Sequence, residues 1–128
     1  MSETTYDLKM DQIEKRVQEA VEKSGQKKCR VQYSAYESDD NGDPIDNLDQ
    51  IAATGKVVLV REANDFFGGE DSEDYKSEVL ENPTWLQVCV RANKMMKVVR
   101  DRHHVYLEGL TKEKEEDGVL IYRFIMGS

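Results

Sequence analysis

Cysteine, proline, histidine and long apolar runs are scarce in this sequence. Of its 128 residues, two are cysteine, two are proline and two are histidine. Two cysteines are too few for a disulfide framework, and no apolar run approaches the roughly 20 residues that cross a bilayer. The first seven residues lack the basic start and the apolar stretch of a signal peptide. We therefore expect a cytoplasmic protein that does not insert into a membrane.

The charge of the chain is concentrated in its middle. The formal net charge is −8, and residues 37–81 contain 14 acidic but only 3 basic side chains. Nucleic-acid binding depends on cationic side chains that neutralise phosphates, so we expect no nucleic-acid partner. The length is that of one domain. We expect residues 1–128 to form a single α+β domain with a long acidic connection at about 63–81.

Two helices are predicted from apolar side chains at three- and four-residue steps. The first runs from about Asp7 to Ser24, with Met10, Ile13 and Val17 on its apolar stripe. The second begins at Asn82-Pro83, because asparagine is a favoured N-cap and proline a favoured first helical residue. Each helix is therefore expected to bury one face against a sheet.

Four strands are predicted from alternating or β-branched residues. They are Lys28–Glu37, Lys56–Glu62, His103–Thr111 and Val119–Met126, and the last two are joined across Lys112–Gly118. The resulting order is helix–strand–strand–helix–strand–strand. It predicts an α+β fold in which two helices pack on one face of a mainly antiparallel four-stranded sheet.

The last strand is apolar on both of its faces. One face carries Leu120, Tyr122, Phe124 and Met126, and the other carries Val119, Ile121 and Ile125. Helices on one side of the sheet would leave the other side uncovered. The missing cover must come from the loop that contains Phe66 and Phe67, from a second copy of the chain, or from a ligand.

No motif in the sequence predicts a catalytic, metal or cofactor site. A calcium loop with Gly42 at its sixth position would place Leu48 where a bidentate glutamate is required. His103 and His104 are adjacent on a predicted strand, so their side chains point to opposite faces. Cys89 lies on the apolar stripe of the second helix, where a thiol packs in the core. The residues favour a protein that is not an enzyme.

The residue pattern predicts a protein that acts by association, as a homodimer through the open sheet face or by binding another protein. The alternative is a pocket for a small ligand, with possible enzymatic use, between sheet and helices and lined by aromatic and polar side chains such as Tyr33 and Trp85. A third hypothesis is an acidic protein that mimics nucleic acid on a partner's basic surface. The residues expected to contact a partner or ligand are Phe66, Phe67, His104, Tyr106, Glu108, Tyr122 and Phe124.

A positive edge is predicted on the second helix, opposite in sign to the acidic segment. It consists of Arg91, Lys94 and Lys97, and it continues into Arg100 and Arg102. We expect it to pair with the acidic segment, either within one chain or between subunits. Exposed pairs of this kind are worth only about 0–1 kcal/mol each, so they would orient a contact rather than drive it.

Overall fold

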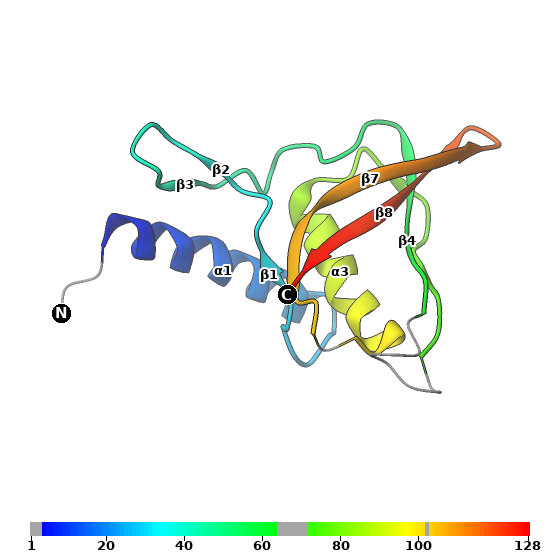
Figure 1. The fold of residues 1–128 in the computed structure, drawn as a ribbon, viewed down its shortest axis with the longest axis horizontal. Helices are drawn as coiled ribbons and strands as arrows, with labels where there is room; N and C mark the ends of the chain where they lie inside the picture. The colour runs from blue at the N-terminus through cyan, green and yellow to red at the C-terminus, as the bar shows by residue number, and fades with distance from the viewer. Residues whose placement is uncertain (1–3, 64–71, 102) are drawn as a thin grey trace.

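The computed structural model describes residues 4–63, 72–101 and 103–128. The elements in chain order are α1 (Thr5–Lys23), β1 (Gln32–Tyr33), β2 (Glu37–Ser38), β3 (Pro44–Ile45), β4 (Lys56–Arg61), β5 (Tyr75–Lys76), β6 (Leu80–Glu81), α3 (Trp85–Val99), β7 (Tyr106–Glu116) and β8 (Val119–Gly127). In Figure 1, α1 and the β2–β3 hairpin extend to one side of a body that α3 forms with β4, β7 and β8. The predicted α+β class with two helices is confirmed for these residues.

The main sheet is mixed and has six strands in the order β1-β7-β8-β4-β5, with β6 also pairing with β4. β1 runs parallel to β7, and β4 runs parallel to β8, whereas β7 and β8 are antiparallel. The prediction of a mainly antiparallel sheet of four strands is therefore wrong. One reason is that the acidic connection contributes β5 and β6, two-residue strands that pair with β4 and are too short to show an alternating pattern.

The predicted strand at 28–37 is broken into separate pieces. Only Gln32 and Tyr33 join the main sheet, and Glu37 and Ser38 pair instead with β3 in a two-stranded hairpin. The physical reason lies in α3. The side-chain oxygen of the buried Asn93 accepts hydrogen bonds from the backbone N–H groups of residues 30 and 31, at 2.7 and 3.1 Å. Those N–H groups are consequently not available to a strand ladder.

Capping threonines fix the start of both helices. Thr4 accepts a hydrogen bond from the N–H of Asp7, and Thr84 accepts one from the N–H of Gln87; in each case the second residue's side chain bonds back to the cap. These are capping boxes. The prediction that Asn82 caps the second helix is wrong, since Asn82 has a positive φ of 46° and its side chain instead accepts from the N–H of Gly55.

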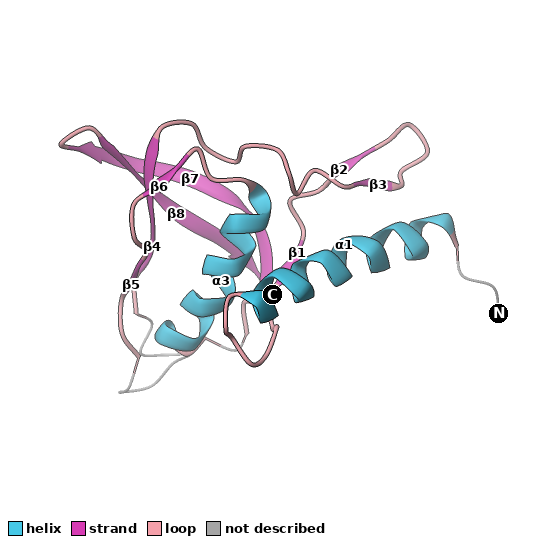
Figure 2. Cartoon of the chain, turned by 180° about the vertical axis from the view of Figure 1, so that it is seen from behind, coloured by secondary structure: helices cyan, strands magenta, loops and turns pink. Residues whose placement is uncertain are grey.

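The two helices play different parts in the core. α3 lies against one face of the sheet, and α1 packs mainly on α3, β1 and β3 (Figure 2). Ion pairs join α1 to the β2–β3 hairpin and to the loop that follows the hairpin. Arg16 contacts Asp46 and Asp49, each at 2.7 Å, and Lys9 lies 3.4 Å from Asp39. The acidic middle of the chain thus pairs in part with α1, a partner that the sequence analysis did not identify.

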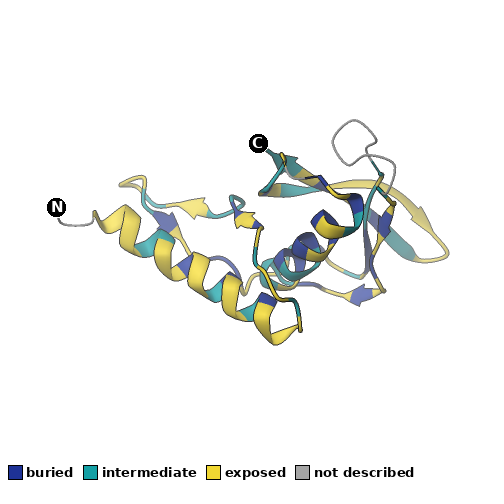
Figure 3. Ribbon diagram, turned by 90° about the horizontal axis from the view of Figure 1, so that it is seen from below, coloured by how far each residue is buried: buried dark blue, intermediate teal, exposed yellow. Residues whose placement is uncertain are grey.

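On the sheet face that no helix covers, neighbouring side chains of the sheet shield one another from solvent. Val58 and Ile121 lie opposite each other on β4 and β8 and are only 3% and 6% exposed. Beside them Arg123 forms an ion pair with Glu113 at 2.8 Å. Figure 3 shows buried residues concentrated between α3 and the sheet, with exposed residues along the β7–β8 hairpin. Of the three apolar residues predicted on this face of β8, only Ile125 is exposed, at 42%.

Candidate functional site

The predicted contact residues on β8 belong to the core or its edge. Phe124 is buried, and its ring centroid lies 6.0 Å from that of Tyr75. Tyr122 is half-buried and packs against the same core cluster. Phe66 and Phe67 lie outside the described residues. In this structure Phe124 is therefore part of the hydrophobic core.

His104 belongs to a charged cluster centred on Asp101, directly after α3. The Asp101 side chain is 0% exposed, and its Oδ2 lies 2.7 Å from Nη2 of Arg61 and 2.7 Å from Nδ1 of His104. Its Oδ1 accepts from the N–H groups of His103 and His104, at 2.9 and 3.2 Å. Burial by itself would raise the pKa of Asp101. The hydrogen bonds from the two N–H groups and from the imidazole, together with the charge of Arg61, outweigh this effect, so the pKa is lowered overall. This cluster fixes the chain between α3, β4 and β7.

Tyr106 and Glu108 lie on the open sheet face. Tyr106 pairs with Gly127, and Ile125 is two residues from Gly127 on β8, so Tyr106 and Ile125 project from the same face. A Cβ added at Gly127 would overlap the carboxylate of Glu108. Glu108 therefore lies directly over the end of β8, close to Tyr106.

Tyr106 also lines a groove that the sequence analysis did not predict. The groove has a volume of about 300 Å³ and lies between α1, the chain at 32–36 and the start of β7. Its side chains are tyrosines and carboxylates with few others: Tyr6, Asp7, Met10, Asp11, Glu14, Gln32, Tyr33, Ser34, Tyr36 and Tyr106. We call it the tyrosine groove.

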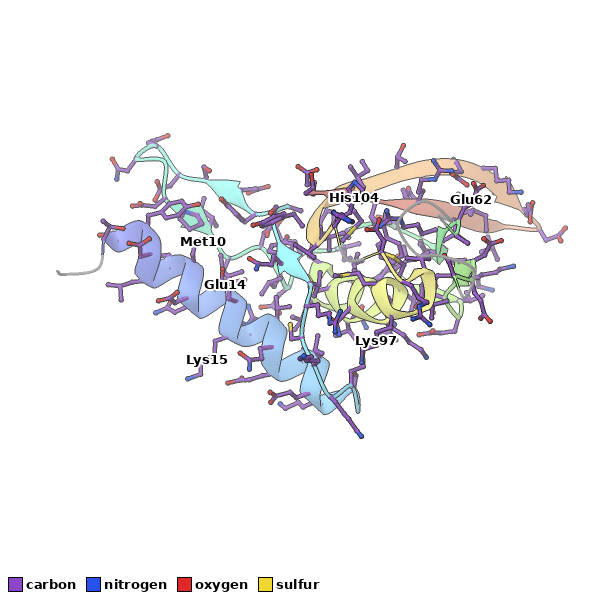
Figure 4. The ribbon with its side chains drawn as sticks, turned by 60° about the horizontal axis from the view of Figure 1, so that its bottom comes forward. Met10, Glu14, Lys15, Glu62, Lys97 and His104 are labelled. Carbon is purple, nitrogen blue, oxygen red and sulfur yellow. The ribbon has the colours of Figure 1, made fainter. Side chains whose placement is uncertain are left out.

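Helix geometry builds one wall of the tyrosine groove. Tyr6, Met10 and Glu14 are four residues apart, so they share one face of α1. In Figure 4, Met10 and Glu14 lie on the side of α1 toward β1 and β3, whereas Lys15 points to the opposite side. The Tyr6 ring and the Glu14 carboxylate of this stripe thereby lie on the side that lines the groove.

Buried contacts hold the opposite wall. The Tyr33 hydroxyl donates to the side-chain oxygen of Asn47, whose amide donates to the carbonyl of Ala35 at 3.0 Å. The Tyr33 ring lies 6.1 Å from that of Trp85, and burial raises the pKa of Tyr33. With both its ring and its hydroxyl fixed, Tyr33 anchors the segment that carries Tyr36.

A hydrogen bond between tyrosines closes one end of the groove. The hydroxyl oxygens of Tyr6 and Tyr36 are 2.8 Å apart. This hydrogen bond is the main cause of a raised pKa for Tyr36, and partial burial is the second cause. The two rings thus join α1 to the chain beyond β1, and their remaining surface faces solvent together with Tyr106, which is 39% exposed.

All the charged side chains that line the tyrosine groove are acidic. Its described lining contains the carboxylates of Asp7, Asp11 and Glu14 and no lysine or arginine. Of this set, sequence reasoning selected only Tyr106 as a contact residue and Tyr33 as part of the alternative ligand pocket. The available signal was the four-residue spacing of Tyr6, Met10 and Glu14, but nothing local to α1 shows that the chain at 32–36 lies opposite this stripe.

Comparison with known proteins yields no relative: no protein family, no curated protein and no solved structure matches the chain. Neither described helix is long and apolar enough to cross a membrane. Within residues 4–63, 72–101 and 103–128, no three or more histidine, cysteine or acidic side chains are grouped so as to hold a metal ion.

Proposed function

We propose that this protein binds another protein, and that the tyrosine groove receives a lysine- or arginine-bearing segment of the partner. The observation that carries the proposal is the lining of the groove, where exposed tyrosine rings and three carboxylates meet without a compensating lysine or arginine among the described residues. A cation above a tyrosine ring gains about 0.5–1 kcal/mol at an exposed site. Nearby carboxylates add an attraction of the same sign.

The size of the groove favours side chains of an extended segment. Its volume of about 300 Å³ lies at the lower end of the range of about 300–1,000 Å³ for small-molecule sites. One or two long cationic side chains fit such a groove, because their apolar stems pack on the rings while the charged ends reach the carboxylates. The net charge of −8 would also steer a basic partner toward the protein.

Self-association through the sheet face is the competing form of association. Its support is the shared orientation of Tyr106 and Ile125, which are 39% and 42% exposed. A stable dimer buries about 800 Å² per partner, and two partly exposed side chains with the flanking ion pair of Arg123 offer little of that as apolar surface. Binding of a basic segment therefore has the stronger support.

The test uses peptides and charge-matched variants. Fluorescence anisotropy at low salt measures binding of a labelled peptide that alternates Lys and Arg with Gly, and a peptide with Glu at the charged positions serves as the reference. The double variant Asp11→Asn/Glu14→Gln should bind the basic peptide about fivefold more weakly or worse, since two exposed charge contacts are lost. Tyr106→Ala should weaken binding by a similar factor.

The control removes the same charge elsewhere. Glu19→Gln/Asp40→Asn replaces two exposed carboxylates that are not part of the groove, and its affinity should stay within about twofold of the parent chain. If this control loses as much affinity as the groove variant, net charge alone attracts the peptide and the proposal is wrong. Sedimentation of the unmodified chain measures self-association separately.

A further inference from the structure

A second groove, opposite in charge to the first, lies between α3 and the loop after α1. Its volume is about 600 Å³, and its described lining contains four cationic side chains and one carboxylate. The lining residues are Ser24, Gly25, Gln26, Lys27, Tyr75, Glu78, Val90, Arg91, Lys94 and Lys97. We call it the basic groove. In a chain of net charge −8, this concentration of positive charge is local.

Three of the four cations stand on one face of α3. Arg91, Lys94 and Lys97 are three residues apart, a spacing that places them on successive turns of the same side. Figure 4 shows Lys97 on the side of α3 away from β7 and β8. Neither Lys94 nor Lys97 forms an ion pair with any residue that the structure describes. Lys94 helps to lower the pKa of Glu78 from beyond ion-pair distance, so both ammonium groups can still contact a ligand directly.

The loop that carries the fourth cation, Lys27, is held in place by a buried amide. Asn93, on the adjacent side of α3, is 1% exposed, and its amide donates at 2.8 Å to Oε1 of Gln26 and at 2.8 Å to the carbonyl of Lys28. Gln26 in turn donates to the carbonyl of Val90 at 3.0 Å. Lys27 lies between the two anchored residues. The backbone on both sides of Lys27 is therefore fixed, so the loop that brings Lys27 into the lining of the groove loses little backbone freedom on binding.

Glu78 partly neutralises the groove in this state. Nε and Nη2 of Arg91 lie 3.0 and 2.6 Å from the same oxygen of Glu78. Arg91 lowers the pKa of Glu78, so the carboxylate is ionised at neutral pH. An incoming anion would compete with Glu78 for this guanidinium while also meeting the unpaired Lys94 and Lys97.

We propose that the basic groove binds a compact, phosphate-bearing small molecule. Phosphate groups carry up to two negative charges and accept several charge-assisted hydrogen bonds, which matches lysine and arginine donors converging from two walls. A volume of about 600 Å³ suits a ligand of nucleotide or sugar-phosphate size. A long polyanion such as duplex DNA is disfavoured, because outside the groove it would meet a protein of net charge −8.

The experiment follows backbone amide shifts of the full chain by NMR, with pyrophosphate and ATP as separate probes at low salt. Saturable shifts are expected at 25–28, 78 and 91–97. The variant Lys94→Gln/Lys97→Gln should bind about tenfold more weakly or worse, because two charge-assisted contacts are lost. The control Lys112→Gln/Lys114→Gln removes two exposed lysines of β7 and should stay within about twofold.

A third variant changes the affinity in the opposite direction. Glu78→Gln removes the competing carboxylate from Arg91 and should bind pyrophosphate about threefold or more tightly; a merely structural role for the ion pair would not raise affinity. No saturable shifts with either probe would overturn the proposal. So would an equal loss in the β7 control, or tighter binding of a duplex oligonucleotide or a Glu-rich peptide than of pyrophosphate and ATP.

Discussion

Replacing Asp101 with alanine should destabilise the fold more than any single change at an exposed ion pair. Its carboxylate is fully buried and accepts from Arg61, from the His104 ring and from two backbone N–H groups. Removing it leaves the guanidinium of Arg61, whose side chain is only 16% exposed, without its buried counter-charge. Loss of one partner of a buried pair costs about 3–5 kcal/mol, out of a total stability of about 5–15 kcal/mol.

Urea unfolding measures this loss. A cost of about 3–5 kcal/mol corresponds to a midpoint about 2 M lower for a chain of this size. Far-UV circular dichroism and the fluorescence of Trp85, the single tryptophan, should report the same transition if unfolding is two-state. Lys114→Ala removes an exposed ion pair with Glu116, at 59% and 55% exposure, and should leave the urea midpoint almost unchanged, because solvent screens exposed charges.

Asp101→Asn separates the charge from the hydrogen bonds. Asparagine keeps an oxygen for the N–H groups of His103 and His104 but loses the charge that faces Arg61, so we expect about half of the alanine effect. If Asp101→Asn is as stable as the parent chain within about 0.5 kcal/mol, the assignment of this stability to the buried charge is refuted.

The pH dependence gives the same variant a second readout. The pKa of Asp101 is lowered in the folded protein, so its contribution is fully present above the unfolded value of about 3.9 and is lost as the pH falls through the lower folded value. The stability difference between the parent chain and Asp101→Asn should therefore be largest near neutral pH. It should shrink below about pH 4, as measured by urea unfolding across pH.

Two further predictions concern side chains that hold backbone in place. Asn93→Ala removes the acceptor for the N–H groups of Arg30 and Val31 and the donor to the carbonyl of Lys28. We expect the free energy of unfolding, measured with urea, to fall by about 3 kcal/mol, and hydrogen exchange to become faster first at residues 26–31. Exchange that becomes faster uniformly along the chain would contradict this prediction. Thr84→Ala removes the N-cap of α3 and should lower the free energy of unfolding by about 1 kcal/mol. Asn82→Ala, at the cap predicted from the sequence, removes instead the acceptor for the N–H of Gly55. It should leave the NMR chemical shifts at the start of α3 unchanged.

Local signals were sufficient for β4, for β8 and for the existence of both helices, but not for the residue at which α3 begins. The apolar stripe at Met10, Ile13 and Val17 predicts α1, and the run of β-branched residues at Lys56–Glu62 matches β4 to within one residue. The β7–β8 turn was placed too broadly, at Lys112–Gly118. Asp117 and Gly118 both have positive φ, the pattern of a two-residue hairpin turn, so β7 continues to Glu116.

The pairing of strands depended on contacts far apart in sequence. β4 and β8 are parallel neighbours although 57 residues and α3 intervene between the last residue of one and the first of the other. Alternation along either strand reports burial of its faces but carries no information about which strand lies beside it. Val58 and Ile121 consequently cover each other, which the apolar pattern of β8 alone could not show.

By itself the sequence determined the class of the fold, the two helices, the acidic middle segment and the apolar character of β8, because each depends on side chains close together in the chain. Only the tertiary structure decided what those residues do. It brought Tyr6 and Tyr36 together across 30 residues, placed Asn93 against the 26–31 loop, and put Lys27 and Lys94 in the lining of one groove. Grooves form where separate segments of the chain meet. The segments are held together by long-range packing and buried hydrogen bonds, which cannot be predicted from residues that are close together in the sequence.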